Sequence, residues 1–388
     1  MIDPTTLPVP PQTPALVIDR VALNANLAAM QARCDAAGVR LRPHGKMHKC
    51  STFGLLQVER GAVGLCCQTV GEAEAFARAG ISDLLVSAPV PPWGAARIAE
   101  ITRTRGCHLA VVCDSTAQID RLGAAAVAAK VTISALVDVN IGMHRAGCTV
   151  DEAPLMAARI TATPGLNYGG VQAYFGNLQH LATGRAEANA AASATLRTLV
   201  AELADQGLAP PVVTGGGTGT FQFDLEAGIF TELQCGSYAL MDVEYLDCGG
   251  PGADWPFAPA LFIAASVVSA KHKGHVTVDV GLKASSADMS PRVVGGAAPG
   301  SLWRSMGDEH GAIVHPAFFA ALSSGTDSAA IDADPALSWQ PDAPGEGDIV
   351  WMLPGHVDPT INLYDAFYVT REDGALDRWP IDARRVSS

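Results

Sequence analysis

The sequence is poor in basic residues, and this shortage excludes two classes of partner. Its 388 residues include 26 Lys and Arg against 39 Asp and Glu, which gives a formal net charge of -13. Nucleic acids and anionic membrane surfaces both attract a basic face. We therefore expect neither a nucleic acid nor a membrane as a partner.

The chain also lacks long apolar runs and a leader. No apolar run reaches the roughly 18 residues that a membrane span needs. Residues 1–12 contain neither the basic region nor the apolar core of a secretory signal. The nine cysteines are an odd number and include no C-x-x-C pair, which is typical of free thiols in a reducing compartment. We therefore expect a cytoplasmic protein.

Short apolar runs alternate with alanine-rich segments along the first two thirds of the chain. A helix is expected over 21–37, and strands over 39–42, 63–67, 84–86, 109–113, 133–139, 169–174, 212–214 and 230–233. Eight strands with intervening helices over about 200 residues predict a (β/α)8 TIM-like barrel, hence an α/β fold. A doubly wound sheet is the alternative, which we disfavour because no G-x-G-x-x-G motif follows the first strand.

The pattern changes near residue 251. Three β-like runs, at 261–270, 275–280 and 349–353, are joined by segments rich in Gly and Pro, and long helical patterns are rare. This texture predicts a C-terminal all-β domain. We expect the barrel to span residues 20–250, and the β domain to span 251–388 together with an N-terminal strand at 13–19.

The end of the first barrel strand carries a lysine. Pro43 and Gly45 prevent the strand from continuing, so Lys46 lies in a tight turn at its C-terminal end, where barrel enzymes place their chemistry. In a dry cavity a lysine is held as the neutral amine, which can form a Schiff base with an aldehyde. Neighbouring side chains carry further nitrogen that favours the neutral amine: His44, His48 and Lys49. A solvated basic loop is the alternative.

Glycine-rich turns follow the last two barrel strands. They are Thr-Gly-Gly-Gly-Thr-Gly at 214–219 and Gly-Ser-Tyr at 236–238. Barrels commonly bind phosphate at these two loops, because glycines let backbone N–H groups approach its oxygens. Combined with Lys46, the loops predict pyridoxal phosphate; flexible turns are the alternative. Arg145, after the fifth strand, could face the pyridine nitrogen or lie on the surface.

A His-x-Asp motif stands near the C-terminus. In an extended segment, His356 and Asp358 would leave the backbone on one face. An imidazole and a carboxylate make a two-ligand site for a divalent ion, and this donor set suits Mn²⁺ or Mg²⁺. A hydrogen-bonded pair at a strand end is the alternative.

Several motifs together resemble one family. The chain is similar to the D-threonine aldolases and 3-hydroxy-D-aspartate aldolases, within the alanine-racemase-like, fold-type III pyridoxal phosphate enzymes. The resemblance spans residues 13 to about 379. It rests on R-P-H-x-K at 42–46, C-C-Q at 66–68, T-G-G-G-T-G at 214–219, T-E-L-Q-x-G-S-Y at 231–238 and G-H-V-D-P-T at 355–360.

The resemblance implies a full set of site residues. Lys46 and His180 are the implied catalytic residues, and His356 and Asp358 the implied ligands of the divalent metal. The implied contacts of pyridoxal phosphate, besides Lys46, are Arg145, Gln172, Tyr174, Thr214, Gly216, Gly217, Thr218, Gly219, Gly236, Ser237 and Tyr238. The implied partner is a small-molecule substrate, and the implied assembly is a homodimer.

The implied reaction is retro-aldol cleavage of a β-hydroxy-D-amino acid, such as D-threonine, to glycine and an aldehyde. Alternatives are a 3-hydroxy-D-aspartate aldolase, a D-serine or 3-hydroxyaspartate dehydratase, an alanine racemase and a non-catalytic pyridoxal phosphate carrier. Asp358 stands where related dehydratases carry cysteine, which favours the aldolase, and the β domain argues against a carrier. Phe175 replaces a histidine of a relative, so we expect it to alter the substrate pocket.

Overall fold

The computed structural model describes residues 3–250, 255–324, 330 and 343–384 and divides the chain into two compact units. The barrel unit consists of Leu27–Tyr238, Cys248–Pro256 and Asp382–Ser388. The β unit consists of Met1–Asn26, Ala239–Asp247 and Phe257–Ile381.

The barrel unit is built on eight strands in the order β2-β9-β8-β7-β6-β5-β4-β3, with every neighbouring pair parallel. They are β2 (Arg40–Leu41), β3 (Leu65–Cys67), β4 (Asp83–Val86), β5 (His108–Cys113), β6 (Ile133–Asp138), β7 (Leu166–Ala173), β8 (Val212–Gly215) and β9 (Glu232–Leu233). Hydrogen bonds from Val63 N to Leu41 O and from Cys66 N to Pro43 O, each 2.9 Å, join the two end strands. The predicted (β/α)8 barrel and all eight of its strand segments are confirmed.

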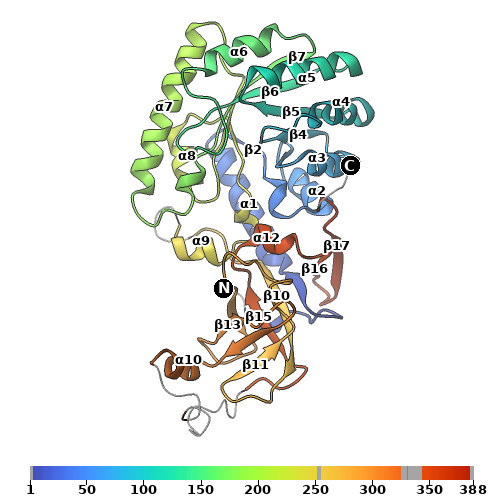
Figure 1. Cartoon of the computed structure of the whole chain (residues 1–388), viewed down its shortest axis with the longest axis vertical. Helices are drawn as coiled ribbons and strands as arrows, with labels where there is room; N and C mark the ends of the chain where they lie inside the picture. The colour runs from blue at the N-terminus through green and yellow to red at the C-terminus, as the bar shows by residue number, and fades with distance from the viewer. Residues whose placement is uncertain (1–2, 251–254, 325–329, 331–342, 385–388) are drawn as a thin grey trace. The chain divides into compact units, whose positions relative to one another are not determined.

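Helices α2 to α8 each connect two consecutive barrel strands and lie outside them, as Figure 1 shows, and α1 precedes β2. They are α1 (Arg20–Ala36), α2 (Ser51–Glu59), α3 (Val70–Arg78), α4 (Gly94–Arg105), α5 (Thr116–Ala129), α6 (Ala153–Ala162), α7 (Arg185–Asp205) and α8 (Phe221–Ala227). Short 3-10 turns are η1 (Pro4–Thr6), η2 (Gly45–Met47), η3 (Gly176–Leu178) and η4 (Ser237–Ala239). In the part of the chain that the structure describes, no helix combines the length and the apolar character that crossing a lipid bilayer requires.

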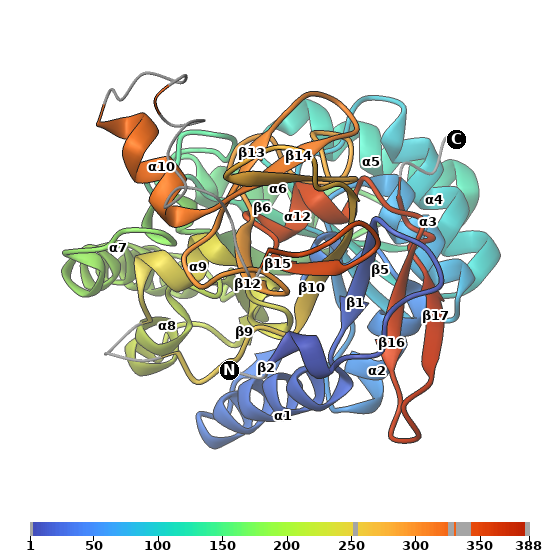
Figure 2. The ribbon, with the colours of Figure 1, turned by 90° about the horizontal axis from the view of Figure 1, so that it is seen from below.

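The β unit holds a nine-stranded sheet in the order β11-β14-β13-β12-β15-β10-β1-β16-β17, and a further β10–β11 pairing closes six of the strands into a barrel. The strands are β1 (Ala15–Ile18), β10 (Leu261–Ser269), β11 (His275–Val278), β12 (Arg292–Gly295), β13 (Leu302–Ser305), β14 (Gly311–Val314), β15 (Ile349–Leu353), β16 (Ala366–Thr370) and β17 (Leu376–Pro380). Figure 2 shows β10, β1, β16 and β17 in succession. The N-terminal strand is therefore part of this sheet.

After residue 238, the described residues of the chain form three short helices: α9 (Val243–Cys248), α10 (Pro316–Ser323) and α12 (Val357–Ile361). Its core gathers residues from distant parts of the chain, among them Val17, Phe262 and Trp351. Sequence analysis found β10, β11 and β15 and missed the other five strands after residue 251. Of these, β12 and β13 have mostly exposed or half-buried residues, whereas β14 is fully buried. A strand with one face in water lacks the continuous apolar run that reveals a buried one.

A buried ion network lies at the bottom of the barrel, where the strands begin. Arg42 donates from Nε to Glu232 Oε1 at 2.8 Å and from a terminal nitrogen to Asp83 Oδ1 at 2.7 Å. The side chain of Arg42 is 7% exposed and that of Glu232 is 1% exposed. Arg40 also approaches Glu232, at 4.0 Å, but its side chain is 48% exposed. The carboxylate of Glu232 is therefore contacted by one buried arginine, Arg42, and approached by one exposed arginine, Arg40.

These two arginines provide a matched pair of variants. We expect Arg42→Ala to lower the free energy of unfolding by about 3–5 kcal/mol, because it leaves Glu232 buried without its close cation. Arg40→Ala should cost less than about 1 kcal/mol, since water screens an exposed pair. Urea denaturation followed by circular dichroism measures both. Equal losses in the two variants would contradict the burial argument.

Candidate active site

Lys46 lies in the turn η2, immediately after strand β2. His44, two residues before Lys46, still pairs with the segment that follows β9, because His44 N donates to Cys235 O at 3.1 Å. The imidazole of His44 then accepts from Lys46 N at 3.4 Å and lies 3.0 Å from the hydroxyl of Ser87. A Cβ on Gly45 would stand 2.5 Å from a ring carbon of Phe76, so only glycine fits there. These contacts fix the turn, and the lysine side chain itself is half-buried.

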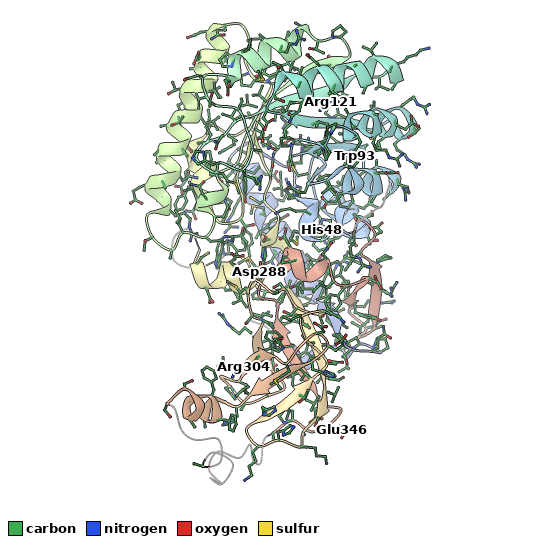
Figure 3. All side chains as sticks on the ribbon, viewed as in Figure 1. His48, Trp93, Arg121, Asp288, Arg304 and Glu346 are labelled. Atoms are coloured by element: carbon green, nitrogen blue, oxygen red, sulfur yellow. The ribbon has the colours of Figure 1, made fainter. Side chains whose placement is uncertain are left out.

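His48 and Lys49 have structural partners of their own. The buried ring of His48 (Figure 3) stacks on Phe53 with centroids 4.4 Å apart, and its Nε2 is 3.1 Å from Gln57 Oε1. Lys49 Nζ lies 3.5 Å from Glu72 Oε1. That both residues favour the neutral form of the neighbouring lysine stays a prediction. His48 is a core residue, and a carboxylate offsets the charge of Lys49.

The glycine-rich loop after β8 is packed against one buried residue, Gln179. A Cβ on Gly217 would come within 2.3 Å of Gln179 Oε1, and a Cβ on Gly219 within 1.9 Å of Gln179 O. Gly219 N donates to the same side-chain oxygen at 2.9 Å. The glycines at 217 and 219 are therefore required by close packing.

A hydrogen bond joins the loops after β8 and β9. Tyr238 N donates to the buried hydroxyl of Thr218 at 3.0 Å. The side chain of Tyr238 is itself buried and hydrogen-bonds to Gln57. Gly236 and Ser237 are half-buried, and a Cβ on Gly236 would lie 3.3 Å from that of His44. The structure thus brings the two predicted phosphate loops and the lysine turn to one edge of the barrel.

Gln172 and Thr214, both predicted to contact the cofactor, belong to a buried polar network. Gln172 Nε2 donates to Asp138 Oδ1 and to Ser87 O, each at 2.9 Å. Gln234 Nε2 donates to Gln172 Oε1 at 3.0 Å and to Thr214 Oγ1 at 2.9 Å. Burial raises the pKa of Asp138 to about 6, although the bond from Gln172 opposes this. The network joins residues at or beside the C-terminal ends of five strands: β4, β6, β7, β8 and β9.

Arg145 and Tyr174 face each other across the top of the barrel. The Arg145 guanidinium carbon lies 5.6 Å from the centroid of the Tyr174 ring, which is within the range of a cation–π contact. Arg145 is exposed, and its loop is ordered by Asn140 Oδ1, which accepts from His144 N at 3.0 Å.

His180 is also exposed and directly follows Gln179. Phe175, by contrast, is fully buried and packs edge-on against Phe230; its effect on the substrate pocket stays a prediction.

The predicted metal ligands lie in the β unit. His356 Nε2 is 4.0 Å from Asp358 Oδ2, so the two side chains are neighbours as expected. The segment is not an extended strand, however, because Asp358 lies in the first turn of α12 and His356 directly precedes that helix. Asp242 fixes the start of the helix, since its Oδ2 accepts from Val357 N at 3.0 Å.

Further carboxylates surround His356. Its Nδ1 is 2.7 Å from Asp288 Oδ2 and 3.9 Å from Glu244 Oε2. Burial lowers the pKa of His356, but the hydrogen bond to Asp288 and the charges of Asp358 and Glu244 outweigh burial and raise it. Within the described ranges, no group of three or more His, Cys, Asp or Glu side chains is arranged to hold a metal ion. The donor types nevertheless suit a divalent cation, and the local charge favours one.

Sequence analysis missed residues whose partners come from distant segments. Gln179, Asp138, Gln234 and Asp288 all have a side chain bonded to a residue at least 34 positions away. One signal was available: Asp138 and Gln234 are polar residues at the ends of apolar strands, where barrels place functional groups. The sequence contains no comparable signal for Asp288.

Comparison with known proteins places the whole chain in a known family. Residues 18–243 match the family of the alanine racemase N-terminal domain, and residues 260–370 match a serine dehydratase domain. The chain is 37% identical to a D-threonine aldolase from Arthrobacter sp, over 97% of this chain and 93% of that protein. It is 38% identical to a 3-hydroxy-D-aspartate aldolase from Paracoccus denitrificans (strain Pd 1222), over 96% and 92%.

A solved structure agrees with these relatives. The crystal structure of a D-threonine aldolase from Filomicrobium marinum superposes with a TM-score of 0.86 at 35% sequence identity. The superposition covers 98% of this chain and 99% of that one. Barrel unit and β unit together therefore have counterparts in one known enzyme.

A buried carboxyl supports the glycine loop from below. Asp224 accepts from Thr220 Oγ1 at 2.6 Å and from Asn189 Nδ2 at 2.7 Å. A Cβ on Gly216 would lie 2.8 Å from Asp224 Oδ2. Burial raises the pKa of Asp224 to about 7 against the opposing hydrogen bonds. The loop that we expect to bind phosphate therefore rests on a carboxyl that titrates near neutral pH.

The titration of Asp224 predicts a pH dependence of stability. Between the ordinary Asp pKa of 3.8 and about 7, the folded state keeps a proton that the unfolded state loses. Stability should therefore fall as pH rises through this range, by up to about 1.4 kcal/mol per pH unit. Asp224→Asn should make this slope smaller, and Glu226→Gln, an exposed change in the same helix, should keep it. A part of the slope should remain in both variants, because burial also raises the pKa of Asp138 to about 6 and that of Asp242 to about 7. Thermal unfolding from pH 5 to pH 8 measures the slope; identical slopes in both variants would exclude Asp224 as its source.

Proposed function

This chain belongs to the alanine racemase N-terminal domain family, and on that basis we propose that it is a pyridoxal phosphate-dependent lyase. The proposed reaction is the retro-aldol cleavage of a β-hydroxy-D-amino acid, such as D-threonine, to glycine and an aldehyde. The observation that carries this proposal is the identity of 37% and 38% with two aldolases over almost the whole chain. Both names describe the cleavage of a β-hydroxy-D-amino acid.

The barrel unit has the features that pyridoxal phosphate requires. Close packing against Gln179 accounts for the glycines at 217 and 219, whose N–H groups donate to Asp224 and to Gln179. The rest of the 215–219 loop, with the hydroxyl of Thr218, would bind the phosphate. Lys46, in the adjacent turn, would hold the aldehyde and then give its place to the substrate amine. Arg145 and Tyr174 would contact the ring. When bound, the cofactor supplies an electron sink for the bond that breaks at the α-carbon.

The β unit has donors that suit a divalent ion, for which we propose Mn²⁺ or Mg²⁺ on His356 and Asp358. An imidazole nitrogen and carboxylate oxygens are the available donors, and Asp288 and Glu244 add negative charge. A bound divalent ion lowers the pKa of a hydroxyl that it contacts. We assign to His180 the removal of the proton from the β-hydroxyl of the substrate. The resemblance also leads us to propose a homodimer.

A dehydratase is the second candidate, because residues 260–370 match a serine dehydratase domain. Such an enzyme would expel the β-hydroxyl and leave a keto acid and ammonia. Asp358 favours the aldolase, since related dehydratases carry a softer cysteine at this position, which suits Zn²⁺.

The products distinguish the two candidates. We expect glycine and an aldehyde from D-threonine, or glycine and glyoxylate from 3-hydroxy-D-aspartate, and no reaction with the L-enantiomers. Aldehyde, glycine, keto acid and ammonia are measured for each substrate of the panel. Lys46→Ala is the control: it should yield no product, and borohydride should no longer fix the cofactor to the protein. Pyruvate and ammonia from D-serine as the main products would establish the dehydratase instead.

The metal is tested by chelation. EDTA should reduce cleavage by orders of magnitude, because the β-hydroxyl then keeps a pKa far above neutral, while the visible absorbance of the bound cofactor persists. Mn²⁺ should restore activity. Asp358→Ala should be coloured, folded and inactive even with Mn²⁺, Asp358→Cys should prefer Zn²⁺, and Asp308→Ala, an exposed change in the same unit, should be fully active. Full activity of the chelated protein would exclude the metal.

A further inference from the structure

Asp288 is a carboxylate that the proposed reaction does not use. It lies in the connection between β11 and β12 and reaches His356, with Oδ2 2.7 Å from the imidazole Nδ1. Figure 3, in the same view as Figure 1, labels Asp288 next to α12. Its side chain is 54% exposed, so as a plain surface ion pair it would contribute little to stability. Its hydrogen bond to His356 gives Asp288 a different role.

The hydrogen bond decides which imidazole nitrogen is available. An exposed Asp is ionised at neutral pH, and an ionised carboxylate can only accept hydrogen bonds. His356 Nδ1 must therefore carry the proton and donate it to Asp288. The lone pair of a neutral imidazole is then on Nε2, which is the nitrogen that lies 4.0 Å from Asp358 Oδ2. Asp288 thus turns the free nitrogen toward the second predicted ligand.

The turn that carries this carboxylate is packed directly on the His356 segment. Ser286 N donates to Thr360 Oγ1 at 3.2 Å, and Thr360 Oγ1 donates to His356 O at 2.7 Å. A Cβ on Gly355 would stand 2.1 Å from Met289 O, so the two main chains are in close contact there. Main-chain and hydroxyl contacts therefore hold the two segments together, which keeps the Asp288 side chain within reach of the imidazole.

We propose that Asp288 is a positioning residue for the divalent metal. It holds His356 in one tautomer and one ring orientation, so that Nε2 and Asp358 present their lone pairs together. A carboxylate behind a metal-bound histidine typically strengthens metal binding by about 10–100-fold. This inference rests on the proposed metal role of His356 and Asp358.

The test is the affinity of the pyridoxal phosphate-loaded protein for Mn²⁺, measured by electron paramagnetic resonance of the free ion. Asp288→Ala should weaken binding by about 10–100-fold, because the ring loses its fixed tautomer and orientation. Asp288→Asn should weaken it less, since the amide oxygen still accepts from Nδ1. Asp358→Ala should abolish measurable binding. Asp308→Asn, an exposed change in the same unit, should bind Mn²⁺ as the unaltered protein does, and thermal unfolding of each variant checks that it is folded.

The outcomes separate this inference from the proposed function. Unchanged Mn²⁺ affinity in Asp288→Ala, with binding lost in Asp358→Ala, would overturn the positioning role and leave the proposed metal site intact. Loss of binding in Asp288→Ala as complete as in Asp358→Ala would make Asp288 a ligand and would also overturn the positioning role. Unchanged affinity in both Asp358→Ala and His356→Ala would remove the metal site itself, and the inference with it.

Discussion

A buried chain of hydrogen bonds determines how the strand ends of the barrel are arranged. It runs from Glu232 through Thr214, Gln234 and Gln172 to Asp138, with links of 2.9 to 3.1 Å. A buried polar group that loses its partner costs about 1–3 kcal/mol, so a slip of one strand would break several bonds together. The chain therefore fixes the register of β6 to β9. The turns that follow these strands inherit that register, and they carry Arg145 and the two glycine-rich loops of the candidate site, whereas the turn of Lys46 follows β2.

The barrel could be predicted from sequence because its strands are buried on both faces. Parallel strands covered by helices read as continuous apolar runs, and residues 109–113 are an example. In the β unit, β12 has no fully buried residue, so no apolar run marks it. The closure of that sheet into a barrel depends on the pairing of β10 with β11, which is a tertiary fact. Apolar patterning therefore predicted the barrel unit, which holds the candidate cofactor contacts, better than the β unit, which holds the candidate metal ligands.

The sequence predicted where the candidate site lies in the barrel better than it predicted which side chains contact one another. The rule that barrel chemistry lies at strand ends found the turn of Lys46 and the two glycine loops, because turns are marked by Gly and Pro. Side-chain direction is not marked in this way. His48 is two residues from Lys46, yet it points into the core against Phe53. Asp288 is 68 residues from His356 in sequence, and only the folded chain brings the two together.

The two candidate centres depend on different physical constraints, and this decides how each tolerates change. The loop at 215–219 is defined by the space that glycines leave, since a Cβ at Gly219 would fall 1.9 Å from a backbone oxygen. Because this constraint is steric, a change of pH or of salt concentration does not alter it. The cluster around His356 is defined by charge, because three carboxylates lie within 4.0 Å of the imidazole nitrogens. In the absence of a cation these carboxylates repel one another, and a divalent ion relieves that repulsion. A substitution should therefore alter the 215–219 loop mainly through shape, and the cluster around His356 mainly through charge. A hard carboxylate at Asp358 in place of cysteine can thus change the preferred metal without disturbing the 215–219 loop.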